Sequence, residues 1–139
     1  MINIIVNSDS RYPVNKLAIQ GAVMEILQGY KIRGNIEISI SIVGDRKMHE
    51  FNKKYRGIDS PTNILTFALE DPVGHNQLQY VSRIGGFVKS PDNTLYLGDI
   101  LISHPMAVKD AGLEGTTVEE ELRFLVQHGT RHLLGLHHD

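Results

Sequence analysis

Between residues 36 and 42 every second position is an isoleucine, and the positions between them are Glu or Ser. This alternation places the isoleucines on one face of a β-strand and the polar side chains on the other. The segment therefore predicts a strand with one face in a hydrophobic core and one polar face. Such a strand requires neighbouring strands and a covering layer, so the chain must build a sheet.

Apolar spacing and turn residues predict the other elements. Asp45 and Ser103 are expected helix N-caps, Thr117 and Glu120 form a capping box, and Gly135 ends the last helix. Residues 71–94 are rich in Gly and predict a loop or an irregular hairpin. Strands are expected at 2–6, 63–69 and 95–103, the last interrupted by Gly98, and helices at 13–29, 45–55, 104–111 and 118–134. The pattern indicates one α+β or α/β domain over residues 1–139.

Composition excludes several classes of protein. The chain has no cysteine, which excludes disulfides and thiolate metal ligands. Its first residues lack a basic segment followed by an apolar one, and no run approaches the ~20 apolar residues of a membrane span. We therefore expect a cytoplasmic protein without membrane contact.

The charge is divided unevenly along the chain. Residues 1–60 hold nine Lys and Arg against six Asp and Glu, whereas residues 61–139 hold five against ten. With a net charge of −2, the whole protein is not a general polyanion binder. The basic excess of the first part predicts either a local basic patch or an ordinary solvated face.

The last twelve residues contain the strongest chemical signal. His128 and His132 are four positions apart on a predicted helix, which puts both imidazoles on one face, one turn apart. Gly135 allows the chain to turn back, so that His138 can reach the same ion; the adjacent His137 is the alternative third ligand. Three histidines with an open fourth position are typical of catalytic zinc sites, so one Zn²⁺ per chain is expected, with Ni or Cu as alternatives.

Gly129 separates this pattern from the common zinc peptidases. In His-Glu-x-x-His enzymes the residue after the first histidine is the glutamate that acts as general base. The spacing here resembles the metzincin motif His-x-x-x-His-x-x-Gly-x-x-His, but a glycine stands at the position of the base. Peptidase activity by the usual route is therefore disfavoured.

Three ordered motifs resemble one family, the YbeY endoribonucleases. The C-terminal motif is His-Gly-x-x-His-Leu-x-Gly-x-x-His over residues 128–138. Residues 51–56 and 59–67 read Phe-Asn-Lys-Lys-Tyr-Arg and Asp-Ser-Pro-Thr-Asn-Ile-Leu-Thr-Phe, and residues 97–103 read Leu-Gly-Asp-Ile-Leu-Ile-Ser. The chain departs from the family at His137, Ser60 and Ala68, where Asp, Lys and Pro are usual, and it stops at Asp139, before the relatives' usual end.

The resemblance implies an α+β fold, with a small mixed sheet packed with helices and a metzincin-like metal-site helix followed by a Gly turn. It implies a zinc-dependent, single-strand-specific endoribonuclease that acts on ribosomal RNA in small-subunit maturation and ribosome quality control. Ribosome or small-subunit proteins are the implied protein partners. The family's metal ligands carry over to His128, His132 and His138, and its arginine to Arg56.

The residues suggest roles in such a reaction and leave alternatives. Arg56 is expected to pair with the scissile phosphate, unless it forms a surface ion pair with Asp59; Lys53 and Lys54 either hold neighbouring phosphates or are simply solvated. Asp99 either hydrogen-bonds to a metal ligand or accepts a hydrogen bond that only stabilises the fold. Asp139 is a candidate to orient a ligand histidine. No general base is evident. A metal-stabilised, non-catalytic ribosome-assembly factor and a metallopeptidase therefore stand as alternative functions.

Overall fold

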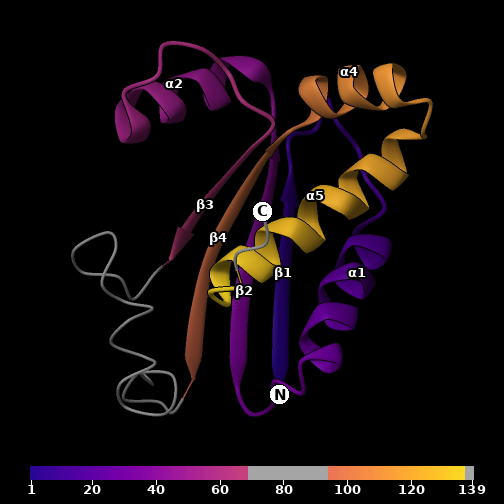
Figure 1. The fold of residues 1–139 in the computed structure, drawn as a ribbon, viewed down its shortest axis with the longest axis vertical. Coiled ribbons are helices and arrows are strands. Elements are labelled where there is room, and N and C mark those ends of the chain that lie inside the picture. Colours follow the sequence, from indigo (N-terminus) through magenta and orange to yellow (C-terminus); the bar gives the residue numbers. More distant parts are fainter. Residues whose placement is uncertain (69–93, 137–139) are drawn as a thin grey trace.

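A computed structural model of the protein describes residues 1–68 and 94–136. Within them, four strands form one sheet in the order β1-β2-β4-β3, with bounds β1 (Ile2–Ser8), β2 (Ile36–Val43), β3 (Ile64–Ala68) and β4 (Leu95–Ser103). The strands β1, β2 and β4 are parallel, and β3 pairs antiparallel with β4 at the edge (Figure 1). The predicted α+β class and small mixed sheet are confirmed.

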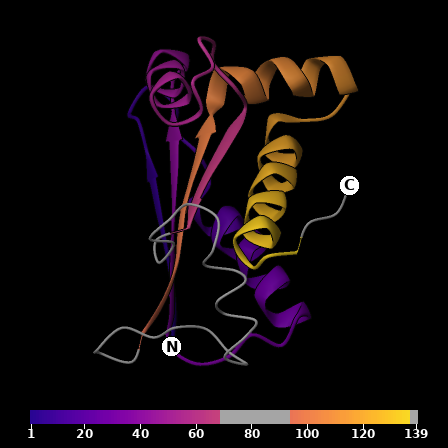
Figure 2. The same cartoon turned by 60° about the vertical axis from the view of Figure 1, so that its left-hand side comes forward.

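Helices lie on both faces of this sheet. The helices α1 (Lys16–Gly29) and α5 (Val118–Leu133) pack side by side on one face (Figures 1 and 2). Helix α5 also contacts β3 and β4. Helix α2 (Asp45–Arg56) packs against a second apolar cluster that contains Leu65 and Leu101. Helix α4 (His104–Glu114) follows β4 directly and leads into α5. The edge strand β3 therefore lies between α5 on one face and α2 on the other.

The isoleucine alternation has the role expected from the sequence. Ile36, Ile38, Ile40 and Ile42 are each at most 1 % exposed and belong to the main core beneath α1 and α5. The Glu and Ser side chains between them are partly exposed on the opposite face. Strand β2 is thus central in the sheet; it pairs with β4 over its whole length and with β1 from Ile36 to Ile42.

Three predicted helix boundaries were wrong. Helix α1 begins at Lys16 rather than at Pro13, because the side chain of Asn15 accepts a hydrogen bond from the Ala18 amide at 3.0 Å and caps the helix there. Asp45 is the first residue of α2 and not its cap, which is Gly44. The carboxylate of Asp45 instead accepts a 2.7 Å hydrogen bond from the Ser103 hydroxyl.

Helix α4 also extends beyond the predicted stop at Gly112. It ends at Glu114, where Gly115 adopts a left-handed conformation with φ of 72°. Ser103 is its N-cap, as predicted, and accepts from the Met106 amide. The predicted loop at 71–94 and the end of the predicted third strand at Leu69 lie outside the described residues, apart from Thr94. None of the helices in the described ranges is long and apolar enough to cross a membrane.

The predicted interruption at Gly98 is a β-bulge. Glu37 pairs with Tyr96, and the next residue of β2, Ile38, pairs with Gly98, so β4 contains one extra residue at this point. Gly98 has a φ of 142°, a conformation that side-chain-bearing residues rarely adopt. On its other side it pairs with Ala68 of β3. The bulge therefore sits where the edge strand attaches to the rest of the sheet.

Candidate functional site

Helix α5 is fixed at both ends by the interactions that its sequence predicted. At its start, Thr117 and Glu120 form a reciprocal capping box with hydrogen bonds of 2.9 and 3.0 Å. At its end, the Gly135 amide donates to the His132 carbonyl and the Leu136 amide to the Arg131 carbonyl, while Gly135 has a φ of 81°. This pair of bonds is a Schellman motif, which stops the helix and turns the chain back.

The two described histidines of the motif lie side by side on α5. The rings of His128 and His132 are nearly parallel, with an interplanar angle of 10° and centroids 6.5 Å apart. Phe124, one turn earlier, stacks on His128 with centroids 6.2 Å apart. Both histidines are exposed at the surface of α5.

Arg56 and the two histidines line the same cavity, although α2 and α5 are far apart in the sequence. This cavity of about 360 Å³ is lined by Arg56, His128, His132 and three consecutive β3 residues, Ile64, Leu65 and Thr66. Its volume is within the range of small-ligand sites. The structure thus brings together three of the four predicted site residues. The fourth, His138, and with it His137 and Asp139, lies outside the described residues.

The sequence allowed an ion pair between Arg56 and Asp59, but the structure does not contain it. Asp59 is instead 2.6 Å from the His49 ring nitrogen and 3.9 Å from the Lys53 ammonium. The hydrogen bond from His49 and the charge of Lys53 lower the pKa of the Asp59 carboxyl. Within the described ranges no carboxylate pairs with Arg56, so its guanidinium is available to a phosphate in the cavity.

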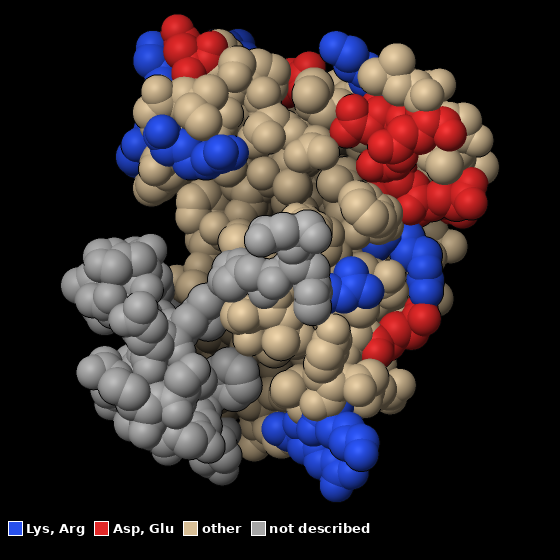
Figure 3. Space-filling model, in the orientation of Figure 1, with Lys and Arg blue, Asp and Glu red and all other residues tan. Residues whose placement is uncertain are grey.

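The charge pattern predicted from the sequence is visible on the surface. Lys and Arg side chains gather over α2, and acidic side chains gather over α4 and the start of α5 (Figure 3). Lys53, Lys54 and Arg56 form the last turn of α2, beside the cavity. A local basic patch is therefore present next to the histidine pair.

The donor set at this cavity fits a zinc ion as far as it is described. Neutral imidazoles one helical turn apart are common zinc ligands. Across residues 1–68 and 94–136 no group of three His, Asp or Glu side chains is placed to hold a metal. The described residues therefore supply two imidazoles, and a third ligand would have to come from outside them, where the sequence places His75, His137 and His138.

Gly129 lets α5 lie close to the sheet. A Cβ atom at this position would be 3.0 Å from Ile100 Cδ1 and 3.1 Å from Ile64 Cδ1. The position therefore points at the sheet beneath the helix, between β3 and β4. A side chain as long as the glutamate that zinc peptidases carry here would be directed into apolar side chains.

Gly129→Val is expected to lower the free energy of unfolding by about 1–3 kcal/mol, because the added methyl groups overpack the contact with Ile100 and Ile64. Gly112→Val is the matched control, since Gly112 is also helical but a Cβ there has nothing within 4 Å. Urea unfolding of both variants measures the difference. Equal midpoints for the two variants would contradict this account of Gly129.

Asp99 faces away from the histidines. Ile100 packs beneath α5, so alternation along β4 places Asp99 on the other face, where it bonds the Ser39 side chain. Burial raises the pKa of this carboxyl, and the Ser39 hydrogen bond partly offsets the effect. The sequence left two roles open for Asp99, and this position favours the role of a hydrogen-bond acceptor that stabilises the fold over that of a partner to a metal ligand.

The sequence interpretation missed two features around Arg56. Asn52, one turn earlier, is 1 % exposed and donates a 2.7 Å hydrogen bond to the Ser60 carbonyl, which holds the turn after α2. Phe51, Tyr55 and Phe67 form an aromatic cluster on the α2 side of β3. The sequence does contain a signal for these features. Phe51 and Tyr55, and likewise Met48 and Asn52, are four residues apart on one helix, which places each pair on a common face.

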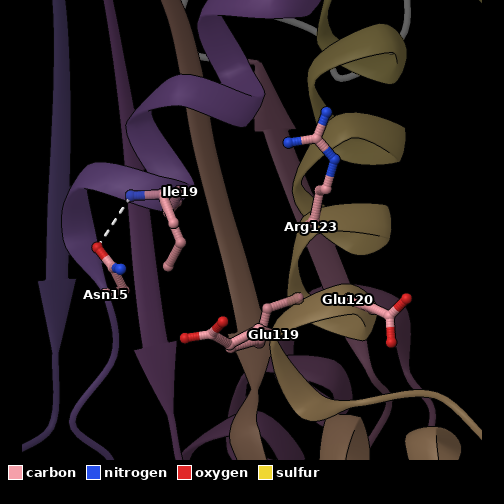
Figure 4. A pocket seen from close by; sticks show the side chains of 7 residues that line it. Asn15, Ile19, Glu119, Glu120 and Arg123 are labelled. Atoms are coloured by element: carbon pink, nitrogen blue, oxygen red, sulfur yellow. Dashed lines mark hydrogen bonds between the residues drawn. The ribbon is translucent and has the colours of Figure 1, made fainter.

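A second cavity, of about 210 Å³, lies between α1 and the start of α5. Its apolar floor includes Ile19 and Leu122, and Figure 4 shows Glu119, Glu120 and Arg123 at its α5 side. It contains none of the predicted site residues. A further cavity of about 500 Å³, whose lining includes Arg11, Tyr12 and Lys47, also contains none of the predicted site residues. The histidine-lined cavity is therefore the candidate functional site.

The sheet, the histidine pair and the facing arginine define a small α+β protein with an imidazole- and guanidinium-lined site, a combination suited to phosphodiester hydrolysis. Residues 4–139 match the family described as Endoribonuclease YbeY. The chain belongs to this family, which confirms the resemblance seen in its motifs.

Individual relatives agree with this assignment. Endoribonuclease YbeY of Roseiflexus castenholzii is 40 % identical over 126 residues, which are 91 % of this chain and 72 % of the relative. That of Moorella thermoacetica is 38 % identical over 136 residues, 96 % of this chain and 81 % of the relative. A solution structure of a Thermotoga maritima protein shares the fold, with a TM-score of 0.58 and 22 % identity over 98 % of this chain and 75 % of the other.

Proposed function

We propose that this protein is a zinc-dependent, single-strand-specific endoribonuclease that acts on ribosomal RNA in small-subunit maturation and ribosome quality control in the cytoplasm. The observation that carries the proposal is the shared cavity of Arg56, His128 and His132. Membership of an endoribonuclease family supplies the substrate class. His138 is proposed as the third ligand of the single zinc ion.

The roles of the side chains follow from their chemistry. The guanidinium of Arg56 can donate two parallel hydrogen bonds to a phosphate. It would hold the scissile phosphate against the histidines and stabilise charge that develops on its oxygens. The histidines would hold the ion; zinc, when bound, polarises a phosphate oxygen and lowers the pKa of a water molecule.

The walls of the cavity favour single-stranded RNA. The site lies between the end of α2 and the end of α5, with β3 as its floor. An extended strand can place one phosphate between two helices, whereas a paired helix has to open before a single nucleotide can enter such a site.

One observation favours the alternative of a non-catalytic assembly factor. No acidic side chain of the described residues lines the cavity, and Thr66 has the only hydroxyl group among the described lining residues. A nuclease therefore has to take its proton acceptor from outside this set, for example from the water at the metal or from the RNA 2′-hydroxyl. An assembly factor would need only the docking surface of Lys53, Lys54 and Arg56.

Arg56→Ala is expected to reduce cleavage of a single-stranded oligoribonucleotide by about 10²- to 10³-fold, the usual effect of removing one donor to developing charge. Arg56→Lys should restore part of this loss, since lysine keeps the charge but not the paired hydrogen bonds. The exposed Arg33, before β2, gives the control Arg33→Ala, which should cleave at the wild-type rate. Absence of cleavage by the wild-type protein would favour the assembly factor, and cleavage by Arg56→Ala at the wild-type rate would remove Arg56 from the reaction.

A further inference from the structure

Tyr55 is an exposed aromatic residue directly before Arg56. Its side chain is 53 % exposed, although the ring is held in place on two sides. Phe51 stacks on it with centroids 5.6 Å apart and an interplanar angle of 14°, and Phe67 meets it at 68° with centroids 5.2 Å apart. The ring is therefore oriented by its neighbours while much of its surface remains open to solvent.

The edge strand β3 connects this ring to the candidate site. Ile64 points toward Gly129 on α5, so alternation directs Leu65 and Phe67 to the α2 side. The histidines and the Tyr55 cluster thus lie on the two sides of one edge strand, with Arg56 lining the cavity between them. A strand of RNA that crosses this edge would contact Arg56 and Tyr55 in succession.

Basic groups surround the exposed ring. The ammonium of Lys54 lies over Tyr55, 5.2 Å from the ring centroid. Lys54 is itself exposed, so its position over the ring shows that a charged group can approach the ring from the solvent side. Lys53 and Arg56 belong to the same helical turn. An open aromatic ring among cations is the combination by which proteins bind the bases and phosphates of single strands.

We propose that Tyr55 is a stacking platform for an unpaired base of the nucleotide next to the phosphate held by Arg56. Lys54 then leaves the ring and pairs with a neighbouring phosphate, while Phe51 and Phe67 keep the ring in its orientation. This inference rests on the proposed function, because it assumes that single-stranded RNA is the ligand. It adds a base-binding subsite on α2 to the histidine-lined cavity.

The absence of tryptophan from the chain makes a direct test possible. Tyr55→Trp places a single indole at the proposed platform, and the added substitution His128→Ala prevents the RNA from being cut during the titration. We expect heptauridylate to quench the tryptophan fluorescence, and a seven-residue abasic ribose-phosphate chain to leave it nearly unchanged. Tyr30→Trp in the same background is the control, since Tyr30 is 44 % exposed beside Lys31 without a ring contact in the described ranges.

Affinity provides a second readout in the same His128→Ala background. Tyr55→Leu, which keeps an apolar cover on Phe51 and Phe67, should bind heptauridylate about tenfold more weakly and the abasic chain equally well. Tyr55→Phe keeps the stacking face and should bind both as the parent does. Equal quenching at positions 55 and 30, or equal affinity of the Leu and Phe variants, would overturn the platform and leave the proposed nuclease intact. If the wild-type protein bound no single-stranded RNA, the proposed function and this inference would both fail.

Discussion

His128→Ala is expected to abolish detectable cleavage of single-stranded RNA and to lower zinc content from one ion per chain to well below one. The imidazole lines the cavity with Arg56 and lies parallel to that of His132 on the same helix face. Removing one of the three proposed ligands would leave too few donors for tight binding, since catalytic zinc sites in proteins use three. Elemental analysis and an RNA cleavage assay on the same preparation measure both effects.

His104→Ala is the matched control for this prediction. His104 is the first residue of α4 and stacks on Tyr12, with centroids 5.0 Å apart and outside the candidate cavity. It should retain both zinc and cleavage. Equal cleavage by His128→Ala and the wild type would indicate a contaminating nuclease, and unchanged zinc content would remove His128 from the ligand set. Cleavage of casein that His132→Ala abolishes would instead support a peptidase.

Local sequence patterns predicted the elements, because their causes are local. The isoleucine alternation of β2 is a two-residue period, and the capping box and Gly135 turn of α5 involve residues within one helical turn. Where prediction failed, two local signals competed. Pro13 and Asn15 both suit a helix start, and the Asn15 side-chain hydrogen bond decides between them.

The candidate site was only partly predictable. The four-residue spacing of His128 and His132 follows from helix geometry, but no pattern along the chain predicts that Arg56 of α2 shares their cavity. That proximity depends on the strand order, which puts β3 at the edge with α2 and α5 on its two faces. Only the family resemblance linked Arg56 to the histidines in advance. Tyr55 and Phe67 were missed for the same reason, since they come from different elements.

The strand order also makes Gly98 a sensitive position in the fold. A Cβ atom there would lie 2.1 Å from the Phe67 carbonyl oxygen and 3.0 Å from the Ala68 Cα, both backbone atoms of β3. Backbone in a paired strand cannot rotate away as a flexible side chain can. Any residue but glycine would therefore push β3 from β4 or abolish the bulge.

We expect Gly98→Ala to lower the free energy of unfolding by about 3–5 kcal/mol, from the combined cost of a strained φ and overpacking. Native domains are stable by only about 5–15 kcal/mol, so the urea midpoint should fall sharply. Gly34→Ala separates the two causes, because Gly34 also has a positive φ, 103°, but nothing lies within 4 Å of its Cβ position. Gly34→Ala should therefore lower the free energy of unfolding only by the cost of the strained φ, about 1–3 kcal/mol.

The two variants also test how the site is held. Ile64 and Thr66 of β3 line the cavity, so displacement of β3 by Gly98→Ala should reduce RNA cleavage even at temperatures where the protein stays folded. Gly34 lies in the turn before β2, away from the cavity, and its variant should cleave normally while folded. If both variants unfolded at the same urea concentration, the contact of Gly98 with β3 would not be the reason for a glycine there. If Gly98→Ala were destabilised yet cleaved RNA normally, the cavity would not depend on the attachment of β3 to β4.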